Sequence, residues 1–270
     1  MTGNITAELL VLRKRAATWI LLGIWTFLGI FFAYVIPYAL DPEDAPAGLD
    51  QFFPESLVEN VIAGFPFFGG VFALMLGVFA LGSEYGWDTL KALFTQRPGR
   101  LRVLAAKLAA LGIVLVPFVL ALFAAGAATS YVITQIEDAP VDWPSAWLLV
   151  RALAAGWLIL AVWAALGVLL GVLTRGTSLA IGIGILYALV IEGLLSNVSA
   201  LESVASIFLR ASGYSIATTL GTSVQDIESS GPGSFGGPFA DSVQAVAVLA
   251  ALIAVFATIS ALLLRRRDVA

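Results

Sequence analysis

The chain has 270 residues, of which 60% are hydrophobic and only 12% are charged, and it contains neither cysteine nor histidine. Soluble domains carry about 25% charged residues, so half that share cannot cover a water-exposed surface, and we interpret the chain as an integral membrane protein. The missing residue types exclude disulfides, thiol nucleophiles, Ser-His-Asp triads and histidine-bound zinc or haem. A net charge of −4 argues against nucleic-acid binding.

Residues 4–17 are predicted to form an amphipathic helix on the inner membrane surface. Ile5, Leu9, Leu12 and Ala16 follow one another at spacings of four, three and four, so they share one helical face. Basic residues end the segment, where the helix dipole favours positive charge. The alternative is a solvated basic terminus that is ordered only by its link to the first span.

Charged residues divide the rest of the chain into six apolar segments. Each is long enough to cross a bilayer core of about 30 Å, which requires about 20 helical residues. We therefore predict an all-α membrane protein with a single transmembrane domain over residues 1–270. The six predicted transmembrane helices are 18–40, 61–83, 108–134, 147–173, 177–196 and 243–264.

The distribution of basic residues predicts that both termini lie inside the cell. In that orientation 12 of the 14 basic residues fall in inner segments and 13 of the 18 acidic residues in outer segments, as the positive-inside rule requires. Arg151 and Arg210 are the two basic residues on the opposite side. We expect a multi-pass protein of the inner (plasma) membrane.

The second predicted span is rich in phenylalanine. Phe65, Phe68 and Phe72 are candidates to line an apolar translocation path. The alternative is that these rings face lipid. Further along, Gly167 and Gly171 are four residues apart in the fourth predicted span, a spacing that permits close helix packing.

The inner loop after the second span carries the strongest local signal. Trp87, Leu90 and Phe94 recur at spacings of three and four, so a short helix here would present an apolar ridge to the cytosol. Pro98 and Gly99 then end that helix. An exposed aromatic ridge indicates a protein partner, and the alternative is an interfacial helix that rests on lipid headgroups.

Glu192 is the one acidic residue inside an apolar segment, the fifth predicted span. A charge in a span is a functional hypothesis by default, so Glu192 is a candidate for the translocation path. The interpretation we favour places its carboxylate at the outer headgroups, paired with Arg151. Residues 197–241, which follow, begin apolar and end rich in Gly, Ser and Pro, which indicates short helices at the outer interface and then a flexible connection.

The inner loop and its flanks resemble the ABC-2 type permease family, the membrane subunits of ATP-binding-cassette exporters. In that family a Glu ends the second span, Gly-Thr-Leu and Leu-Leu follow, and a Pro-x-Arg turn precedes a Lys that opens the third span. The corresponding residues here, with an aspartate in place of the glycine, are Glu84, Asp88, Thr89, Leu90, Leu93, Pro98, Gly99, Arg100 and Lys107. The N-terminal helix, the six spans, the apolar outer segment and the basic C-terminus extend the resemblance over nearly the whole chain.

The resemblance implies an assembly of two permease chains, identical or related, with two copies of a cytoplasmic ABC ATPase. ATP and Mg would bind that partner, because this chain has no G-x-x-x-x-G-K-[ST] motif. We expect the chain to bind no cofactor or metal of its own and to have no enzymatic activity. The residues implied to couple it to the ATPase are Glu84, Trp87, Asp88, Leu90, Lys91, Phe94 and Arg97.

The expected function is therefore that of an exporter permease, embedded in lipid, which moves a hydrophobic or amphiphilic cargo. A secondary transporter or channel without ATP is the main alternative, and it would show several ionisable residues at mid-membrane or broken helices in related halves. A membrane scaffold without transport is the third possibility. A P-loop ATPase in the neighbouring reading frame would favour the first.

Overall fold

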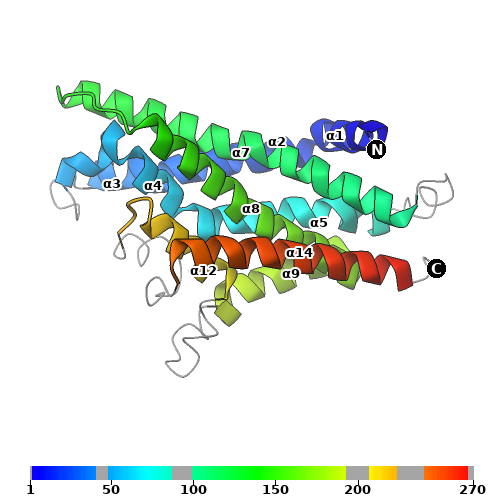
Figure 1. The fold of residues 1–270 in the computed structure, drawn as a ribbon. Helices are drawn as coiled ribbons and strands as arrows, with labels where there is room; N and C mark the ends of the chain where they lie inside the picture. The colour runs from blue at the N-terminus through cyan, green and yellow to red at the C-terminus, as the bar shows by residue number, and fades with distance from the viewer. Residues whose placement is uncertain (1, 41–47, 87–98, 193–206, 224–239, 267–270) are drawn as a thin grey trace.

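The computed structural model describes residues 2–40, 48–86, 99–192, 207–223 and 240–266. All regular structure in these residues is helical. The long helices run along one direction, and α1 (Thr2–Lys14) lies at the same end of the bundle as the last residues of α14 (Ser242–Arg266) (Figure 1). We term this the termini end and the other the distal end.

The helices between α1 and α14 include three π-helical turns, η1, η4 and η5, and two 3₁₀ turns, η2 and η3. In chain order they are α2 (Ala16–Ile30), η1 (Phe31–Val35), α3 (Ile36–Leu40), η2 (Gly48–Phe52), η3 (Pro54–Ser56), α4 (Leu57–Ala63), η4 (Phe65–Gly69), α5 (Gly70–Gly86), α7 (Arg100–Ile136), α8 (Ala146–Thr174), α9 (Thr177–Leu186), η5 (Tyr187–Ile191) and α12 (Leu209–Thr218).

Five segments of the described chain are long and apolar enough to cross a membrane, and they match five of the six predicted spans. They are Ala16–Leu40, Phe65–Gly82, Leu101–Ile136, Ala146–Thr174 and Ser242–Arg266. The fifth predicted span, 177–196, contains a shorter apolar helix, Thr177–Ile191. The described part of that helix rises about 22 Å at 1.5 Å per residue, less than a bilayer core of about 30 Å, so the fifth predicted span stays a prediction.

The predicted N-terminal helix is present as α1, and it packs against α7. Leu12 is buried and Leu9 half-buried on the predicted apolar face, while Ala16 is exposed and belongs to α2. Lys107 of α7 donates to the Glu8 carboxylate at 2.8 Å, and its side chain is only 1% exposed. Protein contacts therefore hold α1 in place, in addition to any contact with lipid.

The centre of the bundle is the contact between α5 and α8, where two glycines allow the backbones to touch. A Cβ atom added at Gly77 would lie 2.0 Å from the carbonyl oxygen of Ala164, and one added at Gly167 would lie 2.2 Å from that of Leu74. No side chain fits at these distances. The glycine spacing in the fourth predicted span is thus a packing face against the second.

The short helix α12 lies within residues 197–241, the stretch that was predicted to begin with short helices. Every residue from Leu209 to Ala217 is buried, and α12 packs against α14, η4, α8 and α4. Its apolar side chains therefore pack against those of the long helices, and a position at the outer membrane interface stays a prediction.

Candidate functional site

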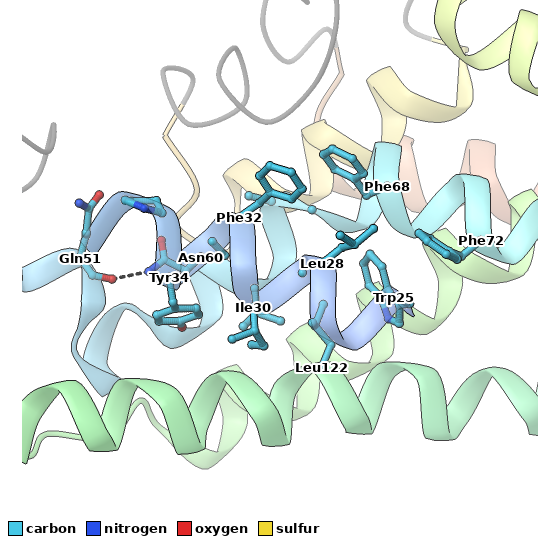
Figure 2. Close-up of a pocket in the computed structure, with 16 residues that line it drawn as sticks. Trp25, Leu28, Ile30, Phe32, Tyr34, Gln51, Asn60, Phe68, Phe72 and Leu122 are labelled. Atoms are coloured by element: carbon cyan, nitrogen blue, oxygen red, sulfur yellow. Dashed lines mark hydrogen bonds between the residues drawn. The ribbon is translucent and has the colours of Figure 1, made fainter. Parts of the chain in front are cut away.

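A cavity of about 340 Å³ lies between α2 with η1 on one side and α4, η4 and α5 on the other (Figure 2). Leu122 of α7 also lines it. Two of the elements around it, η1 and η4, are π-helical. We refer to this space as the α2–α5 cavity.

A proline lies in or beside each of the two π-helical turns next to the cavity, Pro66 in η4 and Pro37 two residues after η1. Neither proline has an N–H group to donate to a helical hydrogen bond. Within the turns the hydrogen bonds run over five residues, from the N–H of Ile36 to the carbonyl oxygen of Phe31 and from the N–H of Gly69 to that of Gly64. Such π-turns are rare and often occur at functional sites.

Aromatic side chains line one end of the cavity. The rings of Phe32 and Phe68 stack, with centroids 6.0 Å apart and planes 14° from parallel, and Trp25 lies 5.9 Å from Phe72. The indole nitrogen of Trp25 donates to the carbonyl oxygen of Phe118 at 3.2 Å. Because that donor is occupied, Trp25 offers the cavity an apolar surface.

The three phenylalanines predicted for a translocation path lie at or beside this cavity. Phe68 and Phe72 line it. Phe65 does not, because it is fully buried and packs edge-on against Trp25 at 5.3 Å, so it supports the cavity from behind. Lipid exposure is therefore wrong for Phe65, and a place in a path stays a prediction for all three.

Polar groups gather at the other end of the cavity. Tyr34, Gln51 and Asn60 line it there, and the Asn60 amide donates to the carbonyl oxygen of Gln51 (Figure 2). None of the described residues that line the cavity is charged. The cavity therefore has an apolar end and an uncharged polar end.

A second group of polar residues is buried where η5 meets α12. The side chain of Glu192, at the end of η5, is fully buried. Its carboxylate accepts hydrogen bonds from the Tyr187 hydroxyl at 2.6 Å and from the backbone N–H groups of Leu209 and Arg210 at 2.7 and 3.1 Å. A negative charge here caps the first turn of α12 and interacts favourably with the helix dipole.

Arg210 belongs to the same group. Its guanidinium donates to the carbonyl oxygen of Ala188 at 3.0 Å and lies 4.6 Å from the ring centre of Phe67. The expected pairing of Glu192 with Arg151 at the outer headgroups is wrong, because Arg151 is exposed on α8 while Glu192 contacts α12.

Sequence reasoning missed the role of Arg210, although a signal for it was present. Arg210 was one of two basic residues on the acidic side of the predicted membrane, and Glu192 was the one acidic residue in an apolar segment. A basic and an acidic residue that both depart from the charge pattern of the spans are candidates to lie close together in the protein interior. The spacing alone did not discriminate between Arg151 and Arg210 as the neighbour of Glu192.

The residues predicted to couple the chain to an ATPase lie mostly outside the described residues. Glu84 is part of α5, two residues before that helix ends at Gly86. The coupling role of all seven stays a prediction, and the six outside the described residues are Trp87, Asp88, Leu90, Lys91, Phe94 and Arg97.

Comparison with protein families identifies the chain. The model of a family described as ABC-2 family transporter protein matches residues 4–191, a region that begins in α1, includes the walls of the α2–α5 cavity and ends with η5. No curated protein matches the chain. The family match covers more than two thirds of the sequence, and this multi-pass membrane protein therefore belongs to the ABC-2 transporter family.

Proposed function

We propose that the chain is the permease subunit of an ABC exporter and moves a hydrophobic or amphiphilic cargo across the inner (plasma) membrane. The observation that carries the proposal is the ABC-2 family match over residues 4–191. The sequence has no P-loop motif, so the energy for transport would come from ATP hydrolysed, with Mg, by a separate cytoplasmic subunit.

The termini end of the bundle is the end that we assign to the cytoplasm. Helices end there in basic residues, with Arg13 and Lys14 in α1 and Arg265 and Arg266 in α14 (Figure 1). The connection at the distal end between α7 and α8 carries acidic residues instead. This distribution supports the predicted orientation with both termini inside.

Contacts of the N-terminal segment support a coupling role for the region around residues 87–98. The Arg15 guanidinium donates to the carbonyl oxygen of Phe79 on α5 at 2.5 Å, and Glu8 pairs with Lys107 on α7. The N-terminal segment is thus attached to both helices that flank the predicted coupling segment. A partner bound there would contact one connected unit.

Two permease chains with two ATPase subunits form the proposed assembly. Only 11% of the most apolar window is buried in Ala16–Leu40 and in Ser242–Arg266. These helices leave wide apolar surfaces for contact with lipid or with a second permease chain. Identical and merely related chains are both compatible with this surface.

The proposal is tested by reconstitution in proteoliposomes with the P-loop ATPase encoded in the neighbouring reading frame. The measured quantity is movement of fluorescent amphiphiles after addition of Mg-ATP, and the control is an ATPase whose P-loop lysine is replaced by alanine. We expect transport only with the active ATPase, from a complex whose mass gives two copies of each chain. Transport driven by an ion gradient without the ATPase would contradict the proposal and favour a secondary transporter.

A further inference from the structure

We propose that the α2–α5 cavity binds an uncharged amphiphile with a single alkyl chain. Its hydrogen-bonding head group lies at Tyr34, Gln51 and Asn60, and its chain lies among the aromatic side chains of α2, η1, η4 and α5. The inference rests on the proposed function only in identifying this amphiphile as the exported cargo. Binding itself requires no ATPase.

The polar end of the cavity lies toward the distal membrane surface and its apolar end lies toward the middle of the bilayer, as in a lipid of the distal leaflet. Trp25 and Tyr34 lie nine and eighteen residues into the span Ala16–Leu40, or about 13 and 27 Å along a helix. In a bilayer core of about 30 Å, Trp25 is therefore near the middle and Tyr34 near the distal surface. Figure 2 shows Gln51, Asn60 and Tyr34 at one end and Trp25 and Phe72 at the other.

The head-group end contains buried donors without a partner. The Tyr34 side chain is 0% exposed, and neither its hydroxyl nor the buried Gln51 Nε2 has a hydrogen-bond partner among the described residues. A buried donor left in this state destabilises the folded chain. A ligand oxygen at this end would accept from these donors and remove that destabilisation.

The chemistry of the head group follows from the same residues. The Asn60 amide nitrogen already donates to the carbonyl oxygen of Gln51, and the side-chain oxygen of Asn60 is an acceptor by chemistry. Donors and an acceptor together suit a hydroxyl group, which both accepts and donates. Because no described lining residue is charged, a charged head group would lose its hydration without gaining a counter-ion.

The size of the cavity limits the apolar part of the ligand. About 340 Å³ is near the lower limit of small-molecule pockets, which range from about 300 to 1,000 Å³. One alkyl chain beside the rings of Phe32, Phe68 and Trp25 suits this volume better than two. The assigned class is therefore a single-chain, uncharged, hydroxyl-bearing amphiphile.

Photolabelling tests the charge preference. The full chain in phosphatidylcholine nanodiscs, without ATPase, receives probes that share one diazirine-bearing alkyl chain and carry a glycerol ester, a phosphate or a trimethylammonium head. Mass spectrometry measures labelling of residues 25–34 and 60–72. We expect the glycerol probe to label these segments at least five-fold more than either charged probe. Equal labelling by all three probes would overturn the proposal.

A filling substitution tests the location. A side chain at Gly64, which lines the cavity, would meet only the Val61 carbonyl oxygen within 4 Å, at 3.9 Å, and the backbone torsion angles there are right-handed helical ones that any L-residue adopts. Gly64→Leu should lower labelling by the glycerol probe at least five-fold. The matched control is Gly23→Leu on the exposed side of α2, where nothing lies within 4 Å. Undiminished labelling of Gly64→Leu would place the ligand elsewhere and overturn the proposal.

Tyr34→Phe provides a test that does not depend on filling the cavity. It removes one hydroxyl that has no protein partner, so thermal stability in detergent should stay the same or rise. The labelling ratio of the glycerol probe to an uncharged methyl-ester probe with the same chain should fall at least three-fold. A purely structural Tyr34 would leave that ratio unchanged, which would contradict the assigned head-group contact.

Transport assays distinguish cargo from a resident lipid. With the ATPase present, loss of ATP-driven movement of the glycerol probe in Gly64→Leu, but not in Gly23→Leu, identifies the amphiphile as cargo. Unchanged transport in Gly64→Leu despite lost labelling would overturn that identification and assign a resident lipid. Selective labelling in a chain that shows no ATP-driven transport of any amphiphile would overturn the proposed function and support the binding site.

Discussion

Glu192 accepts three hydrogen bonds, one from the Tyr187 hydroxyl of η5 and two from the N–H groups of Leu209 and Arg210, which hold the start of α12. Glu192→Ala leaves these three donors buried without an acceptor, at a cost of about 1–3 kcal/mol for an unsatisfied group. We expect the free energy of unfolding to fall by about 3 kcal/mol. The measurement is the thermal midpoint of the purified chain in detergent.

Two variants control this prediction. Glu192→Gln keeps one side-chain oxygen as an acceptor, so its midpoint should lie between those of the native chain and Glu192→Ala. Glu55→Ala removes an exposed acid at the same end of the bundle and should leave the midpoint unchanged. A native midpoint in Glu192→Ala would show that the carboxylate does not stabilise α12.

Charge patterning predicted that Glu192 was unusual but not where it lies. Hydropathy responds to an apolar environment and does not distinguish lipid from protein, because both are apolar. Glu192 therefore looked like the end of a span that reaches the headgroups. Its actual environment depends on α12, seventeen residues later in the chain, and that contact is a property of the tertiary structure.

At the scale of elements, substitution of glycine by alanine should have opposite effects at two positions. Gly167 lies where α5 and α8 touch, and Gly182 of α9 has open space around it. Gly167→Ala places a Cβ 2.2 Å from the Leu74 carbonyl oxygen, and overpacking of this kind costs about 1–3 kcal/mol. Gly182 meets nothing within 4 Å, so Gly182→Ala should gain about 0.5–1 kcal/mol from lower backbone entropy in the unfolded chain. Thermal midpoints in one detergent should fall for the first variant and rise for the second. A rise for both would mean that α5 and α8 do not touch at Gly167.

The sequence alone predicted much of the helical arrangement and little of its irregularity. Five spans were located because charged residues are rare in the bilayer core, and α1 was located because its apolar residues recur at helical spacing. The π-turns at Phe31–Val35 and Phe65–Gly69 were not predicted, although Pro37 and Pro66 were visible signals for them. The phenylalanine-rich second span was recognised, but the walls contributed by α2 and η1 depend on packing between helices.

For the whole molecule, the orientation in the membrane is the first property to test. The chain contains no cysteine, so single cysteines report accessibility without further changes. Asp142→Cys lies in the exposed connection at the distal end and Ser178→Cys is exposed near the start of α9. We expect a membrane-impermeant maleimide to label Asp142→Cys on intact cells and Ser178→Cys only after permeabilisation. The reverse pattern would invert the orientation inferred from the basic residues.

The coupling segment is the last part of the whole-molecule hypothesis. It lies between α5, which ends at Gly86, and α7, which begins at Arg100. The other connection that is predicted to face the cytoplasm, between α8 and α9, contains only Arg175 and Gly176. A cytosolic ATPase would therefore find its largest contact surface on the longer connection.

The spacing of Trp87 and Phe94 predicts the contact that this segment makes. Aromatic anchors at the centre of an interface cost about 2 kcal/mol or more when truncated, and charges at its rim cost less. We expect Trp87→Ala with Phe94→Ala to lower co-purification of the ATPase at least ten-fold and to abolish ATP-driven transport, with Lys91→Ala as the rim control that retains most of both. Yield and thermal midpoint should stay native, because none of these substitutions shortens a span. Native co-purification and transport by the double variant would show that the aromatic residues rest on lipid, and the ATPase contact would then have to lie elsewhere at the termini end.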